Sequence, residues 1–260
     1  MLNTTLHGTA TDRPPLIIAH GLFGSGRNWG AIARRLSDRR QVIAVDMRNH
    51  GDSPWSDRHD YPAMAGDLAE VIAAHGGQAD VLGHSMGGKA AMMLALTHPD
   101  AVNRLVVADV APVAYDHDQR RNVDAMRGLD LTGLTSRSEA DRRLAAVIGD
   151  PTLRSFFLQS LDLRADPPRW RLNLDVLAAE MDRIVGWPEP EAGYPPFPRP
   201  ALFLSGALSN YVRPEYRAQI KALFPAARQA KIPGTGHWLH AENPRAFEAA
   251  VAAFLEPVSG

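Results

Sequence analysis

The stretch Gly83-His84-Ser85-Met86-Gly87 decides the fold, because it fits the pattern Gly-x-Ser-x-Gly and lies between a short apolar run and a helix-like run. Ala79 to Leu82 is typical of a buried strand, and Met86 to Thr97, rich in Ala, Met and Leu, is typical of a helix. The flanking glycines allow a sharp turn that leaves the Ser85 hydroxyl exposed at its tip. This context predicts that Ser85 is a nucleophile; the alternative is a plain strand-to-helix turn.

Outward from this turn, short apolar runs alternate with amphipathic segments. Such alternation predicts a mostly parallel central sheet with helices on both faces, the α/β class. The first clear strand is Leu16 to Ala19. The strands predicted in this way are 16–19, 42–45, 79–82, 104–108, 201–204 and 227–232.

The alternation stops between Pro112 and Pro200, where several helix patterns occur and no convincing strand does. A series of prolines near the end of this segment predicts an extended return to the sheet. We therefore expect a helical cap, residues 113–198, inserted into an α/β core formed by residues 1–112 and 199–260.

The composition is that of an ordinary globular chain: 260 residues, 45% hydrophobic and 22% charged. A formal net charge of −1 gives no basic field for nucleic acid, so we expect a small-molecule partner. The absence of cysteine excludes disulfides and thiolate chemistry. Residues 1–12 lack the pattern of a secretory leader, and no apolar run approaches the roughly 20 residues that span a bilayer, so a cytoplasmic protein without a membrane span is expected.

A serine nucleophile needs a base within hydrogen-bond reach and a third group to orient that base. His237 is the preferred base, because Gly234-Thr235-Gly236-His237-Trp238 follows the last predicted strand directly. His240 is the nearest competitor. The two histidines lack the spacing and the adjacent glutamate of a zinc site, so we interpret His240 as structural and expect no metal.

The developing oxyanion of acyl transfer requires backbone N–H donors. Met86 follows the nucleophile and is expected to supply one donor. The loop His20-Gly21-Leu22-Phe23-Gly24 follows a strand and is expected to supply the other from Leu22, with Phe23 as the fallback. A simple turn or a phosphate cradle is the alternative for this loop, which lacks the Lys-Ser/Thr ending of a P-loop.

The acid is less obvious. A Gly-x-x-Asp pattern is expected after the strand that follows the insertion, but Gly206-Ala207-Leu208-Ser209 has serine at that position. A serine cannot neutralise an imidazolium. Asp109 ends the preceding strand, and adjacent strand ends open onto the same rim of a sheet. We therefore predict Asp109 as the acid and Ser209 as an auxiliary that hydrogen-bonds His237 or Asp109; a carboxylate that caps a loop is the alternative for Asp109.

Several stretches are distinctive in combination: His20-Gly21-Leu22-Phe23-Gly24-Ser25, Asp46-Met47-Arg48-Asn49-His50-Gly51-Asp52-Ser53-Pro54, Gly83-His84-Ser85-Met86-Gly87-Gly88-Lys89, Asp109-Val110-Ala111-Pro112 and Gly236-His237-Trp238-Leu239-His240-Ala241-Glu242. Together they resemble the YbfF-type esterases of the α/β-hydrolase superfamily over nearly the whole chain. The resemblance implies hydrolysis of carboxylic acyl esters without a cofactor. It also favours an acid after the strand that ends at Asp109.

Other conspicuous residues have less specific interpretations. Arg48 and Asn49 are expected to fix the shape of their loop, and Lys89 to pack its stem at the start of a helix. A thioesterase, a carbon–carbon bond hydrolase and a cofactor-free haloperoxidase remain alternatives that keep the same nucleophile. A hydrolase-fold receptor with little turnover is the alternative from another class.

Overall fold

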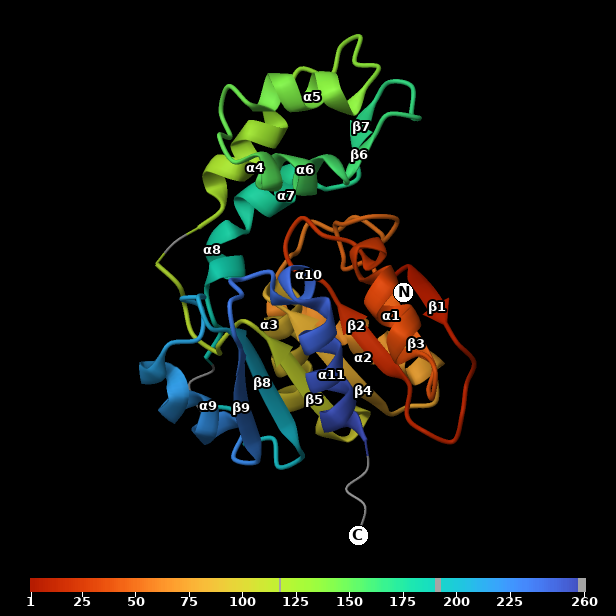
Figure 1. The fold of residues 1–260 in the computed structure, drawn as a ribbon, viewed down its shortest axis with the longest axis vertical. Coiled ribbons are helices and arrows are strands. Elements are labelled where there is room, and N and C mark those ends of the chain that lie inside the picture. Colours follow the sequence, from red (N-terminus) through yellow and green to blue (C-terminus); the bar gives the residue numbers. More distant parts are fainter. Residues whose placement is uncertain (117, 190–192, 257–260) are drawn as a thin grey trace.

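The computed structural model describes residues 1–116, 118–189 and 193–256, and its centre is a seven-stranded sheet of order β1-β3-β2-β4-β5-β8-β9 (Figure 1). Strand β1 pairs with β3 in the antiparallel sense, and every other pair in this sheet is parallel. The α/β class predicted from the sequence is confirmed. The strands are β1 (Thr4–His7), β2 (Leu16–Ala19), β3 (Val42–Val45), β4 (Ala79–His84), β5 (Val102–Ala108), β8 (Ala201–Gly206) and β9 (Ala227–Ile232).

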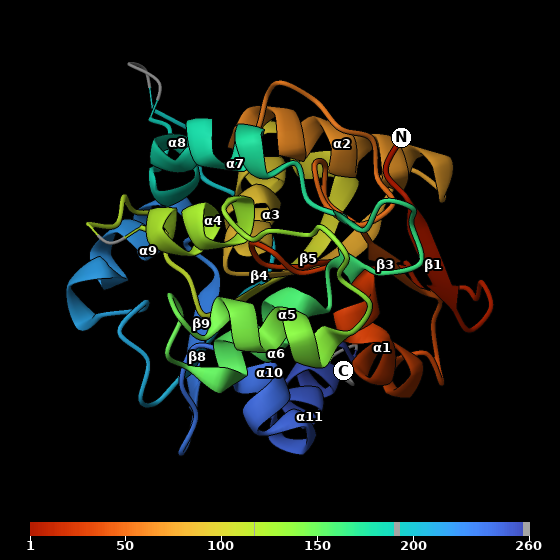
Figure 2. The same ribbon diagram turned by 90° about the horizontal axis from the view of Figure 1, so that it is seen from above.

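Helices cover both faces of the sheet, with α2 and α3 on one face and α1 and α11 on the other (Figure 2). The helices that belong to the sheet region are η1 (Gly26–Trp29), α1 (Gly30–Leu36), α2 (Tyr61–Ala74), α3 (Met86–Thr97), η2 (Pro99–Ala101), η3 (Pro214–Tyr216), α9 (Arg217–Leu223), α10 (Leu239–Glu242) and α11 (Pro244–Leu255). In the described part of the chain, no helix has both the length and the apolar character needed to cross a membrane.

Between β5 and β8 the chain leaves the sheet and forms a group of short helices above the carboxyl ends of the strands (Figure 1). Its elements are α4 (Arg120–Arg127), α5 (Arg137–Leu144), α6 (Pro151–Leu158), β6 (Leu161–Asp162), β7 (Arg169–Trp170), α7 (Leu174–Ala179) and α8 (Met181–Val185). The antiparallel pair β6 and β7 contradicts the expectation that this segment contains no strand. Strands of two residues are too short to produce an apolar alternation, which explains the error.

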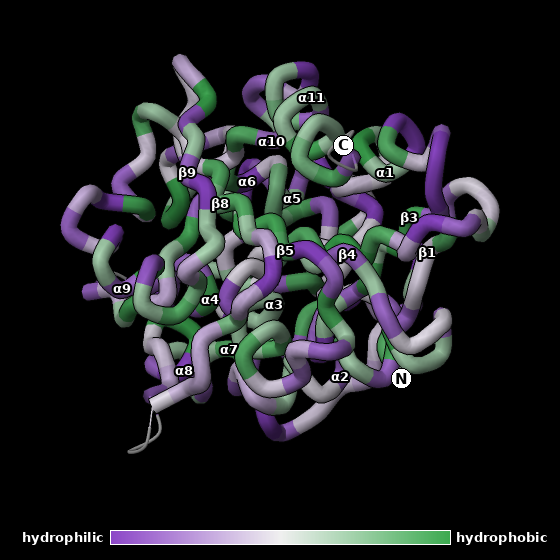
Figure 3. Tube along the Cα trace, turned by 90° about the horizontal axis from the view of Figure 1, so that it is seen from below, coloured by the Kyte–Doolittle hydropathy of each residue, from purple (hydrophilic) through white to green (hydrophobic). Residues whose placement is uncertain are grey.

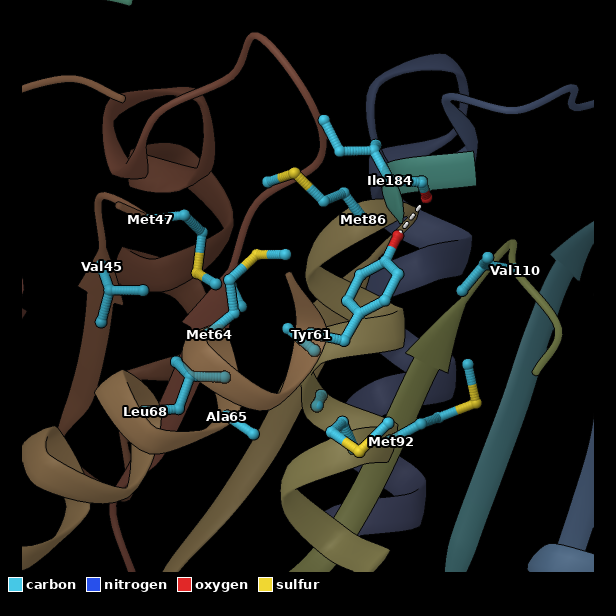
Figure 4. Packing of buried hydrophobic residues seen from close by; sticks show 14 of the residues in the cluster. Val45, Met47, Tyr61, Met64, Ala65, Leu68, Met86, Met92, Val110 and Ile184 are labelled. Atoms are coloured by element: carbon cyan, nitrogen blue, oxygen red, sulfur yellow. Dashed lines mark hydrogen bonds between the residues drawn. The ribbon is translucent and has the colours of Figure 1, made fainter. Parts of the chain in front are cut away.

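The hydrophobic core has two parts, one on each face of the sheet, because successive side chains of a strand point to opposite faces. Ile17, Val81 and Val107 belong to the part that faces α2 and α3, whereas Ile18 and Leu82 belong to the part that faces α1 and α11. In Figure 3 hydrophobic residues gather in the interior, and many outer loops are hydrophilic. Figure 4 shows the first part at close range, with side chains of α2 and α3 packed together.

Candidate active site

Ser85 occupies the turn between β4 and α3, with φ 53° and ψ −119°. A positive φ is unfavourable for a residue with a side chain, and it persists here because the surroundings fix the turn. A Cβ atom at Gly83 would collide with the carbonyl of Gly87, and a Cβ atom at Gly87 would collide with the carbonyl of Ala19. Only glycine at both positions lets the strand and the helix approach so closely, and the turn presents the Ser85 side chain at the carboxyl edge of the sheet.

His237 reaches the same edge from the loop after β9. Its Nε2 lies 3.1 Å from the Oγ of Ser85, and its Nδ1 lies 2.7 Å from Oδ2 of Asp109. With the proton on Nδ1, the ring donates to the carboxylate and accepts from the hydroxyl, which is the tautomer that a general base requires. The ring of Tyr211 stacks on that of His237 at a centroid distance of 3.9 Å. No sequence pattern indicates this stacking.

Asp109 follows β5, is fully buried and has a φ of 51°. Its Oδ1 accepts the N–H of Gly206 at 3.0 Å, and its Oδ2 accepts the hydroxyl of Ser209 as well as the N–H of His237. The structure therefore brings Ser85, His237, Asp109 and Ser209 together, and it places the Ser209 hydroxyl on the carboxylate. Three donors compensate the burial of the charge.

The loop after β2 passes close to Ser85: a Cβ atom on Gly21 would lie 3.2 Å from the Cβ of Ser85. The N–H of Gly24 bonds the carbonyl of Gly21 at 3.0 Å, which closes a turn with Leu22 and Phe23 at its centre. The N–H of Phe23 donates to a histidine ring. No hydrogen bond within the described part of the chain uses the N–H of Leu22, so Leu22 rather than the fallback Phe23 has a donor available.

Met86 is the first residue of α3. An N–H in the first turn of a helix has no intrahelical acceptor, and the positive end of the helix dipole lies there. The predicted donors, Leu22 and Met86, therefore flank Ser85 from two different elements. Both residues line the same cavity as Ser85 and His237.

That cavity has a volume of about 280 Å³ and lies between the sheet region and the segment from α4 to α8. Its walls are mostly apolar or aromatic. The helical segment contributes Leu153, Phe156, Phe157, Ile184 and Val185. Residues outside the stretch from α4 to α8 contribute Leu22, Phe23, Tyr61, Lys89, Val110, Tyr115, Tyr211 and Trp238. An apolar pocket beside a serine suits the hydrocarbon part of an acyl group.

Lys89 lies one helical turn after Ser85 and is buried. Its Nζ donates to the carbonyls of Val185 and Gly186 at 2.8 and 2.7 Å, and burial lowers its pKa to about 7. The Tyr61 hydroxyl donates to the neighbouring carbonyl of Ile184 (Figure 4). The packed stem expected from the sequence is present, but the contact of the ammonium with the end of α8 is a tertiary feature that the sequence did not reveal.

His240 is half-buried and packs against Trp29, with the two rings stacked at a centroid distance of 4.3 Å. Burial, with a smaller effect from His237, lowers the pKa of His240 to about 3, so the ring is neutral. Over residues 1–116, 118–189 and 193–256, no group of three or more His, Asp or Glu side chains is arranged to hold a metal ion. These contacts agree with a structural interpretation of His240.

A family model described as the alpha/beta hydrolase fold matches residues 14–244. The chain belongs to the α/β-hydrolase family. It is 40% identical to the mouse sn-1-specific diacylglycerol lipase ABHD11 over 96% of this chain and 83% of the mouse protein. It is 38% identical to the Escherichia coli esterase YbfF over 94% of both chains, which confirms the resemblance found in the sequence.

Solved structures agree with these relatives. A marine microorganism esterase superposes with a TM-score of 0.92 at 38% identity, over 97% of this chain and 98% of that protein. Family membership and these esterase relatives identify the chain as a serine ester hydrolase of the α/β-hydrolase fold.

Proposed function

We propose that Ser85, His237 and Asp109 form the catalytic triad of this ester hydrolase. The observation that carries the proposal is the continuous chain of contacts from the Ser85 hydroxyl through the imidazole to the buried carboxylate, at 3.1 and 2.7 Å. Each residue follows a different strand of one mostly parallel sheet, at the edge where ligands of open α/β sheets bind. Hydrogen bonding aligned in this way is what a weak hydroxyl nucleophile needs.

The reaction proceeds by acyl transfer in two steps. The Ser85 Oγ attacks the ester carbonyl while His237 Nε2 takes its proton, and the N–H groups of Leu22 and Met86 stabilise the tetrahedral oxyanion. His237 then protonates the leaving alcohol. In the second step His237 activates water, which attacks the acyl group on Ser85, and the serine is restored as the carboxylic acid leaves.

Ser209 is an auxiliary that acts on Asp109 and not on the imidazole. Its hydroxyl donates to the same Oδ2 that accepts from His237, and its own oxygen accepts the N–H of Tyr211 at 3.2 Å. These bonds fix the orientation of the carboxylate. Ser209 therefore occupies the Gly-x-x-Asp position without supplying a charge, and the charge comes from Asp109 on the neighbouring strand.

The substrate proposed is a small-molecule carboxylic ester whose acyl chain fits the apolar cavity beneath a cap. We assign the cap to residues 113–198 and the core to residues 1–112 and 199–260. Residues 117 and 190–192 of this cap lie outside the described residues. The relatives named esterase and lipase support an acyl ester as the substrate. Cytoplasmic location and the absence of a nucleic-acid partner stay predictions from the sequence.

Steady-state hydrolysis of 4-nitrophenyl esters, from acetyl to long acyl chains, tests this function over several turnovers. We expect sustained turnover in the wild type, with a preference for a chain length that the cavity holds. The variant Ser85→Ala should lose on the order of 10⁶ in kcat, because nothing replaces the nucleophile. A single stoichiometric burst would instead indicate a receptor, and turnover of thioesters alone would indicate a thioesterase.

A further inference from the structure

The backbone of Phe23 is held by hydrogen bonds at both its N–H and its carbonyl. Its N–H donates to Nε2 of His50 at 3.1 Å, and its carbonyl accepts the hydroxyl of Ser160 at 3.0 Å. Phe23 has a φ of 66° and stands third in the turn that begins at Gly21, where a type II turn requires a positive φ. A strained conformation of this kind persists only where neighbours determine it, and His50 and Ser160 are those neighbours.

The His50 ring presents a lone pair, and not a proton, to Phe23. Its Nδ1 lies 2.8 Å from the carbonyl of Arg48, so Nδ1 carries the proton and Nε2 is the acceptor. The ring is completely buried, and the rings of His20 and His59 lie 5.1 and 5.5 Å away. Burial and the two neighbouring histidines keep the pKa of His50 well below its usual value, so the ring stays a neutral acceptor.

We infer that His50 is a positioning residue for the oxyanion hole. By accepting the N–H of Phe23, it fixes the rotation of the turn so that the N–H of Leu22 is the one left for the substrate oxygen. A rotated turn would direct the donor away from the tetrahedral oxygen, where its stabilisation is lost. This inference rests on the proposed function, because it presupposes that Leu22 is an oxyanion donor.

The cap holds the loop that carries His50. The N–H of Gly51 donates to the carbonyl of Arg171 at 2.8 Å, and the N–H of Asn173 donates to the carbonyl of Asn49 at 3.0 Å. His50 and Leu172 form a β-bridge between these two bonds. The turn at Leu22 is thus tied to the cap through His50 as well as through Ser160.

A matched pair of variants isolates the role of His50 Nε2 as the acceptor of the Phe23 N–H. In His50→Gln the amide oxygen lies where Nε2 lay and still accepts the N–H of Phe23, whereas in His50→Asn the amide reaches only the position of Nδ1. We expect His50→Asn to lower kcat by roughly 10- to 100-fold with KM within about threefold, somewhat less than the 100- to 1000-fold typical when a donor is removed. His50→Gln should recover most of this loss. His98→Asn, at an exposed histidine, is the control for histidine replacement.

Binding of a trifluoromethyl ketone provides a readout that a purely structural role would not move. This inhibitor forms a tetrahedral oxyanion on the serine, so its Ki in His50→Asn should rise by the same factor by which kcat/KM falls. Equal kcat and Ki in the Asn and Gln variants would overturn the inference. Turnover that survives Ser85→Ala would overturn the proposed function instead, so the two failures are distinguishable.

A second variant keeps the test decisive if His50→Asn does not fold. Leu22→Pro removes the N–H itself, and proline is favoured at the second position of this type of turn. We expect a loss of about 100-fold or more in kcat and a parallel rise in the Ki of the ketone. Unchanged values for both would show that Leu22 donates no hydrogen bond to the oxyanion and would also overturn the role of His50.

Discussion

The sheet region and the helical segment from α4 to α8 contribute to the site in different ways. The sheet region supplies the proposed triad, each member at the carboxyl end of a strand: Ser85 after β4, Asp109 after β5 and His237 after β9. The helical segment supplies walls of the cavity, such as Phe156 and Ile184. Backbone geometry fixes the first set, whereas side-chain packing and a few hydrogen bonds between the two regions hold the second.

This difference predicts two kinds of mutational effect. Changes at the strand ends should act on the chemical step and affect every ester alike. Changes at the contacts between the two regions should act on the shape of the cavity and affect esters according to their acyl length. The predictions that follow test this contrast.

Among variants that keep Ser85, replacement of the acid should have the largest effect. In Asp109→Asn the side chain keeps its size but loses its charge, so it no longer selects the correct tautomer of His237 or stabilises the imidazolium. We expect kcat to fall by ~10⁴ for short and long esters alike. Steady-state kinetics on the ester series measures this loss.

Replacement of Ser209, the proposed auxiliary, provides a comparison for the loss of kcat in Asp109→Asn. Ser209→Ala removes one of three donors to the carboxylate and should lower kcat by about tenfold. This loss lies at the lower end of the roughly 1.5–3 kcal/mol that a hydrogen bond to a charged group contributes, because two donors remain. An Asp109→Asn enzyme with most of its activity intact, combined with a large loss in Ser209→Ala, would contradict the assignment of the acid.

The sequence predicts the parts of the site that local geometry determines. The turn at Ser85 has a glycine pattern because a Cβ atom would collide there, and buried strands such as β4 are visible as apolar runs. Asp109 required the strand-end rule and a family resemblance, because Ser209 occupies the position where an acid is expected. The features that the sequence does not predict either depend on contacts between distant residues or lack an apolar run. His50 bonds a residue 27 positions away, and β1 consists of partly exposed residues with no apolar run.

Acid should destabilise the sheet region through its buried histidines. Burial lowers the pKa of His20, His50, His59, His84 and His240, to about 3 for His59 and His240. Below pH 6.5 the unfolded chain binds protons that the folded chain excludes, so the free energy of unfolding falls as the pH falls from 6.5 toward 3. At pH 5 a histidine with a folded-state pKa of about 3, such as His59 or His240, costs about 2 kcal/mol relative to pH 7.

The variant His240→Phe isolates one of these contributions, because phenylalanine preserves the stacking on Trp29 without a titratable group. We expect the difference in unfolding free energy between pH 7 and pH 5, measured by urea denaturation, to shrink by about 2 kcal/mol. An unchanged difference would show that His240 takes up its proton in the folded protein. The predicted cap has a single histidine, His117, which lies outside the described residues, so this acid effect belongs to the sheet region.

Lys89 tests the contacts between the two regions, because it joins α3, the helix that follows Ser85, to the end of α8. Lys89→Met keeps the length of the stem but removes the ammonium donor, so the carbonyl of Gly186 loses its bond to Lys89 and that of Val185 keeps only the N–H of Tyr115. The lost hydrogen bonds are partly offset, since a buried ammonium costs free energy to desolvate. We expect KM for long-chain esters to rise by roughly tenfold, which corresponds to about 1.4 kcal/mol. The kcat for the acetyl ester should stay within about threefold, because a displaced α8 alters a wall of the cavity and not the triad.

Lys221→Met is the matched control, since Lys221 also donates to two carbonyls, those of Pro225 and Ala227, but lies outside the cavity. This control should shift thermal stability without changing the dependence of KM on acyl length. If Lys89→Met lowers kcat equally for every ester, the contact acts on the chemical step, and the separation between the reacting groups and the cavity walls fails at Lys89. If the dependence of KM on acyl length changes in Lys89→Met but not in Lys221→Met, the Lys89 ammonium sets the shape of the acyl pocket through its contact with the end of α8.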